Sequence, residues 1–166
     1  FMTDPGKTLT FDSNKPNEQN PMLQEAFGRT VGKSFTLVYD GKEYGPVGIR
    51  YKGSVGSFIF CVAESTPEHP TMIGGAKTCP KLSMKVSFNE YDPNGRFFGV
   101  KKLVFQSMNL DSSLMKERLG YWLYRQMGVA APRAVHARLS INGKYQGVFL
   151  NLEEVDSRFI KAHFAD

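Results

Sequence analysis

The chain has 166 residues, of which 41% are hydrophobic, and it carries a formal net charge of +5. That length predicts one domain or one lobe of a larger unit, and the apolar content excludes wholesale disorder. No apolar run approaches the roughly 20 residues that a membrane-spanning helix needs. The positive charges are scattered, so they favour anionic partners in general, and we do not expect nucleic acid among them.

The first 21 residues are rich in Asn, Pro, Lys and Asp, which is typical of a tail or linker. Farther along, apolar and polar residues alternate on both sides of Asp40-Gly41, which predicts a β-hairpin. The second strand of this hairpin runs into the polar stretch RYKGSVGSF, residues 50–58.

This stretch allows two interpretations. Its glycines permit close approach of a ligand to the backbone, and successive N–H groups can form a nest that binds an anion. An ordinary polar turn uses the same residue types. Taken alone, the pattern favours the ordinary turn.

Two cysteines, Cys61 and Cys79, bracket a segment rich in proline and glycine. A disulfide formed in an oxidising compartment and two unrelated reduced thiols explain them equally well. No CxxC occurs and the three histidines are far apart in the sequence, so a zinc site is not predicted.

Residues 81–89, KLSMKVSFN, alternate strictly, which predicts a strand with one buried and one polar side. The side expected to be buried carries Leu82, Met84, Val86 and Phe88. Lys85 and Lys81 share the polar side. A short strand, KKLVFQS, is expected to follow after a turn.

One long helix is predicted in DSSLMKERLGYWLYRQMG, with Asp111 as its N-cap and Gly128 as its C-terminal stop. We expect its apolar stripe to pack on the sheet and to bury Trp122. That stripe consists of Met115, Leu119, Trp122, Leu123 and Met127. The opposite side carries Glu117 together with Gly120 and two tyrosines, so it is expected to contact protein as well.

Alternation around Asn142-Gly143 predicts a second hairpin, and a short helix is expected at 155–164. His136, in the first strand of that hairpin, is expected to be a packed or surface histidine because no partner for base catalysis is evident. The order of elements predicts an α+β fold in which one long helix packs on a twisted, mostly antiparallel sheet of about five strands.

The motifs GxSxG, HExxH and Walker A do not occur. A lysine on a strand and a glutamate on a helix, beneath a glycine-containing strand turn, are the residues with which protein kinases hold a nucleotide. Lys85 and Glu117 fit this pattern, and we expect their charges to lie within about 4 Å, or to come within that distance after a small shift of the helix. Lys81 is the rival lysine, and a solvated lysine is the alternative for both.

Several stretches strongly resemble the spore coat protein H (CotH) kinase-like family. They are VGIRYKGSVGSF, KLSMKVSFNEY, FFGVKKLVFQSMNLDSSLMKERLGYWLYRQMGVAAPRA and LSINGKYQGVFLNLEEVDSRFIKAHF. The resemblance runs from about Val47 to Phe164. It implies a protein-kinase-like fold. It also implies an enzyme that phosphorylates serine or threonine hydroxyls of secreted or surface proteins, using ATP with Mg or Mn.

On this resemblance the chain is a kinase-like N-terminal lobe at 22–155, preceded by a tail at 1–21. Residues 156–166 form the exit toward a second lobe, where the catalytic residues are expected, so none is expected here. The turn after Arg50 then covers phosphates, and residues 151–155 form a hinge whose backbone meets the adenine. The residues expected to bind the cofactor are Arg50, Lys52, Gly53, Ser54, Lys85, Glu117, Glu153, Glu154 and Val155.

Such a protein is expected to be extracellular or surface-associated, with protein substrates or assembly partners. The alternative is a non-catalytic structural or adhesive module of a coat, wall or large extracellular assembly. A weaker alternative is a surface module that binds anions or glycans.

Overall fold

The computed structural model describes residues 4, 6–13, 34–52 and 81–164. The strands are β1 (Thr8–Ser13), β2 (Phe35–Tyr39), β3 (Lys42–Tyr51), β4 (Met84–Ser87), β5 (Lys102–Gln106), β6 (Ala134–Ile141) and β7 (Lys144–Leu152). The helices are α2 (Lys116–Gln126) and α3 (Ser157–His163). Cys61, Cys79, Gly53 and Ser54 lie outside the described residues.

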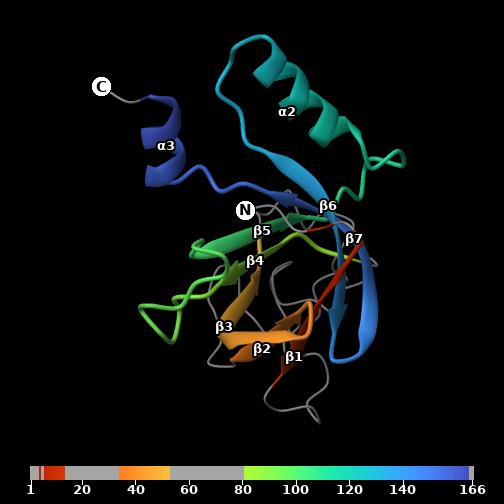
Figure 1. Cartoon of the computed structure of the whole chain (residues 1–166). Coiled ribbons are helices and arrows are strands. Elements are labelled where there is room, and N and C mark those ends of the chain that lie inside the picture. Colours follow the sequence, from red (N-terminus) through yellow and green to blue (C-terminus); the bar gives the residue numbers. More distant parts are fainter. Residues whose placement is uncertain (1–3, 5, 14–33, 53–80, 165–166) are drawn as a thin grey trace, which may run out of the picture.

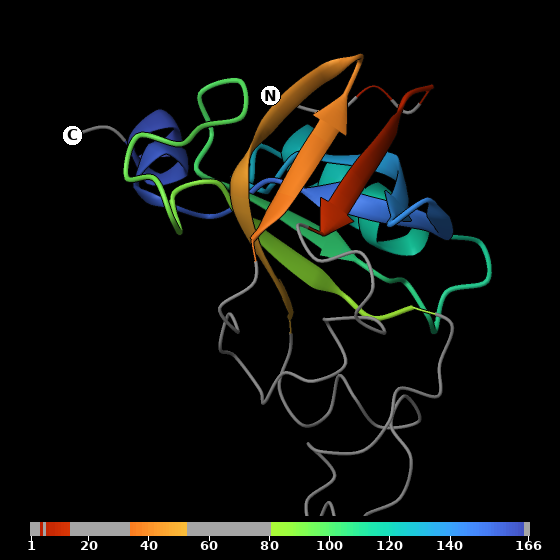
Figure 2. The ribbon, with the colours of Figure 1, turned by 90° about the horizontal axis from the view of Figure 1, so that it is seen from below.

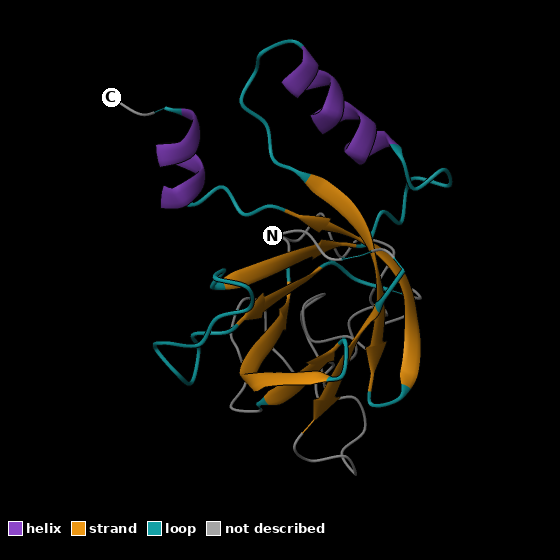
Figure 3. Ribbon diagram, in the orientation of Figure 1, coloured by secondary structure: helices purple, strands orange, loops and turns teal. Residues whose placement is uncertain are grey.

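The strands form a closed barrel in the order β1-β2-β3-β4-β5-β7-β6. Neighbouring strands are antiparallel except where β1 runs parallel to β6 and closes the barrel, with Leu9 opposite Leu139. Figure 1 and Figure 2 show the curved sheet from two directions. Both helices lie outside it, as the purple elements in Figure 3 make plain.

The expected fold, an α+β layer of about five strands with one long helix packed on it, is wrong. In the part of the chain that the structure describes, the barrel has seven strands, and the two helices are short. The difference begins at β1, which lies in the region 1–21 that we expected to be a tail. Because β1 pairs with both β2 and β6, it converts an open sheet into a closed one.

Both predicted hairpins are confirmed. β2 and β3 meet at Asp40 and Gly41, with φ of 54° and 72°, and β6 and β7 meet at Asn142 and Gly143, with φ of 49° and 73°. Two consecutive residues with positive φ are what a two-residue type I′ turn requires. Asn-Gly and Asp-Gly are therefore reliable hairpin signals in this chain.

The core fills the inside of the barrel. The alternation around β4 is confirmed, because Leu82, Met84, Val86 and Phe88 are all buried. Aromatic rings add to this core: Phe97 stacks on Phe88 with centroids 5.2 Å apart, and Phe105 meets Phe11 edge to face at 6.3 Å. The apolar side of every strand thus finds its partners within the barrel itself.

The predicted helix starts later than expected. Asp111 lies four residues before the N-cap, Met115, and yet its carboxylate still accepts a hydrogen bond from the Lys116 amide at 2.8 Å. The predicted stop is confirmed: Gly128 has φ of 75°. Around it the Gly128 amide bonds the Arg125 carbonyl and the Val129 amide bonds the Tyr124 carbonyl, which is the Schellman pattern.

The expected orientation of the helix is also wrong. Trp122 is 51% exposed, and none of the residues of α2 is buried. The side turned toward the protein is instead the polar one, where Glu117, Gly120 and Tyr121 are partly buried. A closed barrel buries its own apolar face, so it does not need a helix to cover that face. Neither described helix is long and apolar enough to cross a bilayer.

This orientation predicts unequal effects of two aromatic truncations. Trp122→Ala should lower the free energy of unfolding by less than about 1 kcal/mol, because the side chain is half in solvent. Phe105→Ala should cost about 3–5 kcal/mol, because it empties part of the core. Denaturant titration measures both values. A Trp122→Ala loss as large as that of Phe105→Ala would contradict the exposed helix.

Candidate functional site

A row of side chains crosses the outer face of the barrel. Met84 and Val86 of β4 point into the core, so Lys85 between them points out. The strand registers place Arg50 beside Lys85, Lys85 beside Val104, and Val104 beside Leu152. Two basic residues therefore lie side by side, next to an apolar floor formed by Val104 and Leu152, and the register of four strands fixes this order.

Lys85 forms an ion pair with Glu154, which lies two residues beyond the end of β7. Both side chains are about one-fifth exposed, at 20% and 21%. We had expected Glu117 as the partner of Lys85. The pair with Glu154 forms because the chain leaves β7 along the outer face, immediately after Leu152 in the row.

Glu117 lies instead within electrostatic reach of Lys52. Burial lowers the pKa of Lys52, and the charge of Lys85 lowers it further. The negative charges of Glu117 and Glu154 oppose this change. Burial raises the pKa of Glu117, which the charge of Lys52 and the hydroxyl of Tyr121 oppose. The Lys52 amide also donates to the Ser83 carbonyl at 2.7 Å, which anchors the end of β3 against the segment before β4.

Lys52, Lys85, Glu117 and Glu154 thus form one group of charges, here named the lysine–glutamate cluster. They come from the end of β3, from β4, from α2 and from the segment after β7. Partial burial strengthens their interactions relative to bulk water. Two ammonium groups held near an apolar floor can bind a polyanion, and the two carboxylates can orient them.

The other predicted residues are placed differently. The Arg50 guanidinium contacts the carbonyl of its neighbour Tyr51 at 3.5 Å and lies beside Lys85 in register. Val155 is 57% exposed. Glu153 is turned toward Arg133 and away from the cluster. The predicted roles of all these residues in holding a nucleotide stay predictions.

Arg133 and Glu153 clamp the entry of β6 to the exit of β7. The Glu153 carboxylate accepts from the Arg133 amide at 3.0 Å and from its guanidinium nitrogens at 3.2 and 2.6 Å. In return the Glu153 amide donates to the Arg133 carbonyl at 2.9 Å. Burial alone would raise the pKa of Glu153, but the hydrogen bonds from Arg133 outweigh it and hold that pKa below 4.5.

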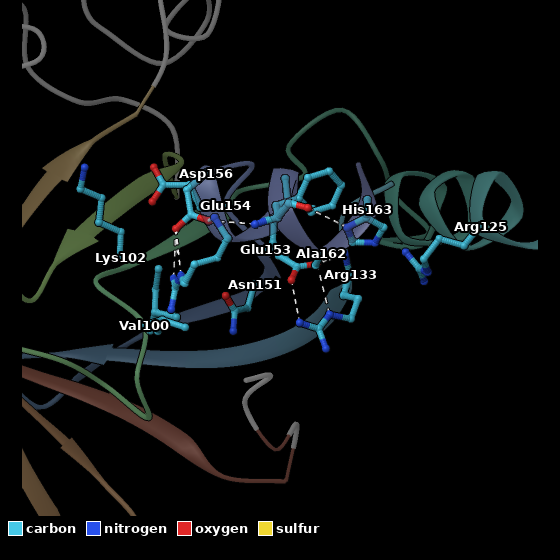
Figure 4. Close-up of a pocket in the computed structure, with 14 residues that line it drawn as sticks. Val100, Lys102, Arg125, Arg133, Asn151, Glu153, Glu154, Asp156, Ala162 and His163 are labelled. Atoms are coloured by element: carbon cyan, nitrogen blue, oxygen red, sulfur yellow. Dashed lines mark hydrogen bonds and ion pairs between the residues drawn. The ribbon is translucent and has the colours of Figure 1, made fainter. Parts of the chain in front are cut away.

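A pocket of about 500 Å³ adjoins the cluster and shares Glu154 with it. Figure 4 shows it between β5, the end of β7 and α3, with the Arg133–Glu153 pair in its wall. Asp156 in the same wall pairs with Arg158 at 3.1 Å and caps α3 through the Arg158 and Phe159 amides. The three carboxylates that line this pocket, Glu153, Glu154 and Asp156, are therefore already paired within the protein.

Sequence reasoning missed the side-chain role of Glu154, the clamp, and the floor of Val104 and Leu152. The alternation of β7 places Leu152 and, two residues on, Glu154 on one side, which was a usable signal. The neighbour of each strand was not readable, because register between distant strands depends on the whole barrel.

The Lys85–Glu154 pair predicts a measurable coupling. In a double-mutant cycle, Lys85→Met and Glu154→Gln should couple by about 1 kcal/mol of unfolding free energy, because their charges are in contact and partly shielded. The matched cycle of Lys85→Met with Glu117→Gln should give less than about 0.5 kcal/mol. A larger coupling energy for Lys85 with Glu117 than for Lys85 with Glu154 would instead support the pair expected from the sequence.

The Arg133–Glu153 clamp predicts a dependence of stability on pH. Because the folded pKa of Glu153 is depressed, its stabilisation is fully present above its ordinary value of 4.5 and is lost as the pH falls through the folded value. Arg133→Met should therefore destabilise the protein at pH 7, and this destabilisation should shrink as the pH falls below 4.5 and through the folded value. Unfolding midpoints across this range measure the difference. A difference in unfolding midpoint between wild type and Arg133→Met that does not change with pH would contradict the clamp.

Comparisons with known proteins agree with the family that the sequence suggested. The family model described as CotH kinase protein matches residues 49–166. The inner spore coat protein H of Bacillus subtilis (strain 168) is 34% identical over 87 residues, which are 52% of this chain and 23% of that protein. The inner spore coat protein H-like protein of the same organism is 31% identical over 84 residues, 51% of this chain and 26% of that protein.

The matched segments span about a quarter of the length of these curated relatives. The family model, in contrast, covers most of this chain and includes every member of the lysine–glutamate cluster. The resemblance inferred from the sequence is confirmed, and the chain belongs to the CotH kinase protein family.

Proposed function

We infer that this chain binds ATP through the lysine–glutamate cluster and serves a protein phosphotransferase of a coat or surface structure. The observation that carries this proposal is the convergence of Lys52 and Lys85 with two glutamates on the outer face of the barrel. Four separate elements supply these residues, so the convergence is a product of the fold and not of a local charge run.

The cluster suits a triphosphate. Each lysine is a compact cation with three donors, and phosphate oxygens accept charge-assisted hydrogen bonds from such groups. The ion pair with Glu154 orients Lys85 before a ligand arrives, and Glu117 lies within electrostatic reach of Lys52. Arg50, beside Lys85, adds a third cation to the same face.

The surroundings offer room for the base. Val104 and Leu152 form an apolar floor next to Lys85, and the adjoining pocket has a volume within the usual range for small ligands. Glu153 and Glu154 line that pocket, so the expected contact between this segment and an adenine is sterically reasonable.

The divalent metal expected with ATP finds less support. Among the described residues, no three His, Cys, Asp or Glu side chains gather in a way that could hold a metal ion. The metal would therefore reach this part of the protein bound to the phosphates of the nucleotide. The chemistry that the described residues supply is the binding and orientation of those phosphates.

The phosphate acceptor is proposed to be a serine or threonine hydroxyl of a coat or surface protein. The support comes from the name of the family and from the relatives, which are named as inner spore coat proteins. Transfer also needs a base near the acceptor hydroxyl. None of the described residues is assigned that role.

A second candidate is a structural module of a coat, favoured by the solvent-facing apolar side of α2. Trp122, Leu123 and Met127 are exposed there on successive turns of the helix. A surface of this kind is suited to protein contacts in an assembly. On this alternative the cluster stabilises the fold and binds no nucleotide.

Calorimetric titration of the chain with MgATP and MnATP tests the proposal. The wild type should bind, and Lys85→Met and Lys52→Met should each weaken affinity at least about tenfold, because a hydrogen bond to a charged group contributes roughly 1.5–3 kcal/mol. Circular dichroism spectra checked in parallel should show that the variants keep the barrel.

Lys81→Met is the matched control. The Lys81 ammonium donates to the Val148 carbonyl at 2.6 Å and lies over the Phe149 ring, so its charge is committed away from the cluster. Its removal should change affinity less than about threefold if no phosphate contact is lost. Absence of binding by the wild type at millimolar MgATP would reject the nucleotide site and leave the structural module.

A further inference from the structure

The attachment of α2 to the barrel depends on few contacts. The helix has no buried residue, and β6 is the strand with which it makes its main contact. Figure 1 shows α2 standing off the barrel above the start of β6. Whatever holds its first turn also sets the position of Glu117.

His136 of β6 contacts both ends of that first turn. Its Nε2 lies 2.7 Å from the carbonyl oxygen of Leu114, just before the helix, and its Nδ1 lies 3.3 Å from Nη1 of Arg118. Glu117 is the residue before Arg118. The His136 ring therefore connects β6 to the Leu114 carbonyl, which precedes Glu117 in the chain, and to the Arg118 side chain, which follows it.

These two contacts define the protonation state of the ring. A carbonyl oxygen can only accept a hydrogen bond, so Nε2 must carry the hydrogen. A guanidinium can only donate, so Nδ1 must present its lone pair. Both contacts are satisfied together only by the neutral imidazole protonated on Nε2.

We propose that neutral His136 is a positioning residue that fixes the first turn of α2, and with it Glu117, against β6. The positioning follows from the contacts alone, whereas its effect on nucleotide binding rests on the proposed function. The ring is not a catalytic residue, because it acts through Leu114 and Arg118 and does not reach the lysine–glutamate cluster directly.

Protonation would release one of the two contacts. An imidazolium has no lone pair on Nδ1, and it would place a second cation opposite Arg118. Arg118 would then turn away, and the first turn of α2 would be held by the Leu114 contact and by the Asp111 carboxylate on the Lys116 amide.

Within the described part of the chain, no carboxylate is paired with this ring. None of the ion pairs among the described residues includes His136. The charged side chains of α2, of the segment before it, and of β6 and β7 are Asp111, Lys116, Glu117, Arg118, Arg125, Arg138 and Lys144. Arg125 bonds the Pro132 carbonyl, and Lys144 lies at the far end of β7, opposite Ile141. Asp111 is bonded to Ser113 and to the Lys116 amide, Glu117 faces Lys52, and the Arg138 guanidinium bonds the Gly6 carbonyl. Opposite His136 on β7 stands the uncharged Leu150.

The first measurement is the tautomer of His136, obtained at pH 8 from two-bond proton–nitrogen correlation spectra of the full chain. The expected pattern is a neutral ring with hydrogen on Nε2. A ring protonated on Nδ1, or on both nitrogens at pH 8, would overturn the proposal. This readout does not depend on any nucleotide.

The second measurement is amide hydrogen exchange in the first turn of α2. Arg118→Met and His136→Leu should speed exchange there at pH 8, while His136→Gln, which keeps a donor for the Leu114 carbonyl, should have a smaller effect. Arg138→Met is the matched control. Arg138 lies in β6, like His136, but its guanidinium bonds the Gly6 carbonyl and not α2. Equal exchange in Arg118→Met and Arg138→Met would contradict the positioning role.

The third measurement is MgATP affinity between pH 8 and pH 5.5. Wild-type affinity should fall by about fivefold or more on acidification, the lower range of coupling between two linked sites. In Arg118→Met that fall should be absent, because the contact that protonation breaks is already missing. A fall of equal size in wild type and Arg118→Met would reject the link to the cluster. If no MgATP binds at any pH, the proposed function fails, and the first two measurements still decide the position of α2.

Discussion

The parallel pairing of β1 with β6 is the constraint on which the structure depends. Without it, the other strands would form an open sheet whose inner face needs a cover, and a helix would have to supply one. With it, the inner face closes on itself around Phe11, Phe105 and their neighbours. The helices are thereby left outside, where α2 turns a polar side toward the barrel and an apolar side toward solvent.

The lysine–glutamate cluster is a consequence of that arrangement. Lys85 lies within the ladder of β3, β4 and β5. Lys52 directly follows β3, where its amide bonds the Ser83 carbonyl, and Glu154 follows β7 and pairs with Lys85. Glu117 is different, because it is carried by a helix without a buried anchor. The cluster therefore combines three charges on or directly after strands with one whose position depends on a few polar contacts.

Local features were predictable from the sequence, and long-range ones were not. The turns at Asp40-Gly41 and Asn142-Gly143, the alternation of β4 and the stop at Gly128 depend on residues close together in the chain, and all were correctly predicted. The closure by β1, the orientation of Trp122 and the partner of Lys85 depend on which distant segments meet. An apolar stripe on a helix has the same sequence pattern whether it packs on an open sheet or faces solvent beside a closed barrel. The sequence of α2 therefore could not show that Trp122 is exposed.

Barrel closure also has a consequence for how the chain folds. Among the described strands, β1 precedes β2, β3, β4 and β5 in the chain, and its partner β6 follows them, so one side of β1 stays unpaired until β6 is available. Contacts between such distant segments form slowly, because a long loop must be ordered before they can contribute. Until then β1 and β6 are the two open edges of a nascent sheet. Unpaired edges are the usual sites of pairing between chains, so the strand that gives the mature barrel its closed form is also its main aggregation risk during synthesis.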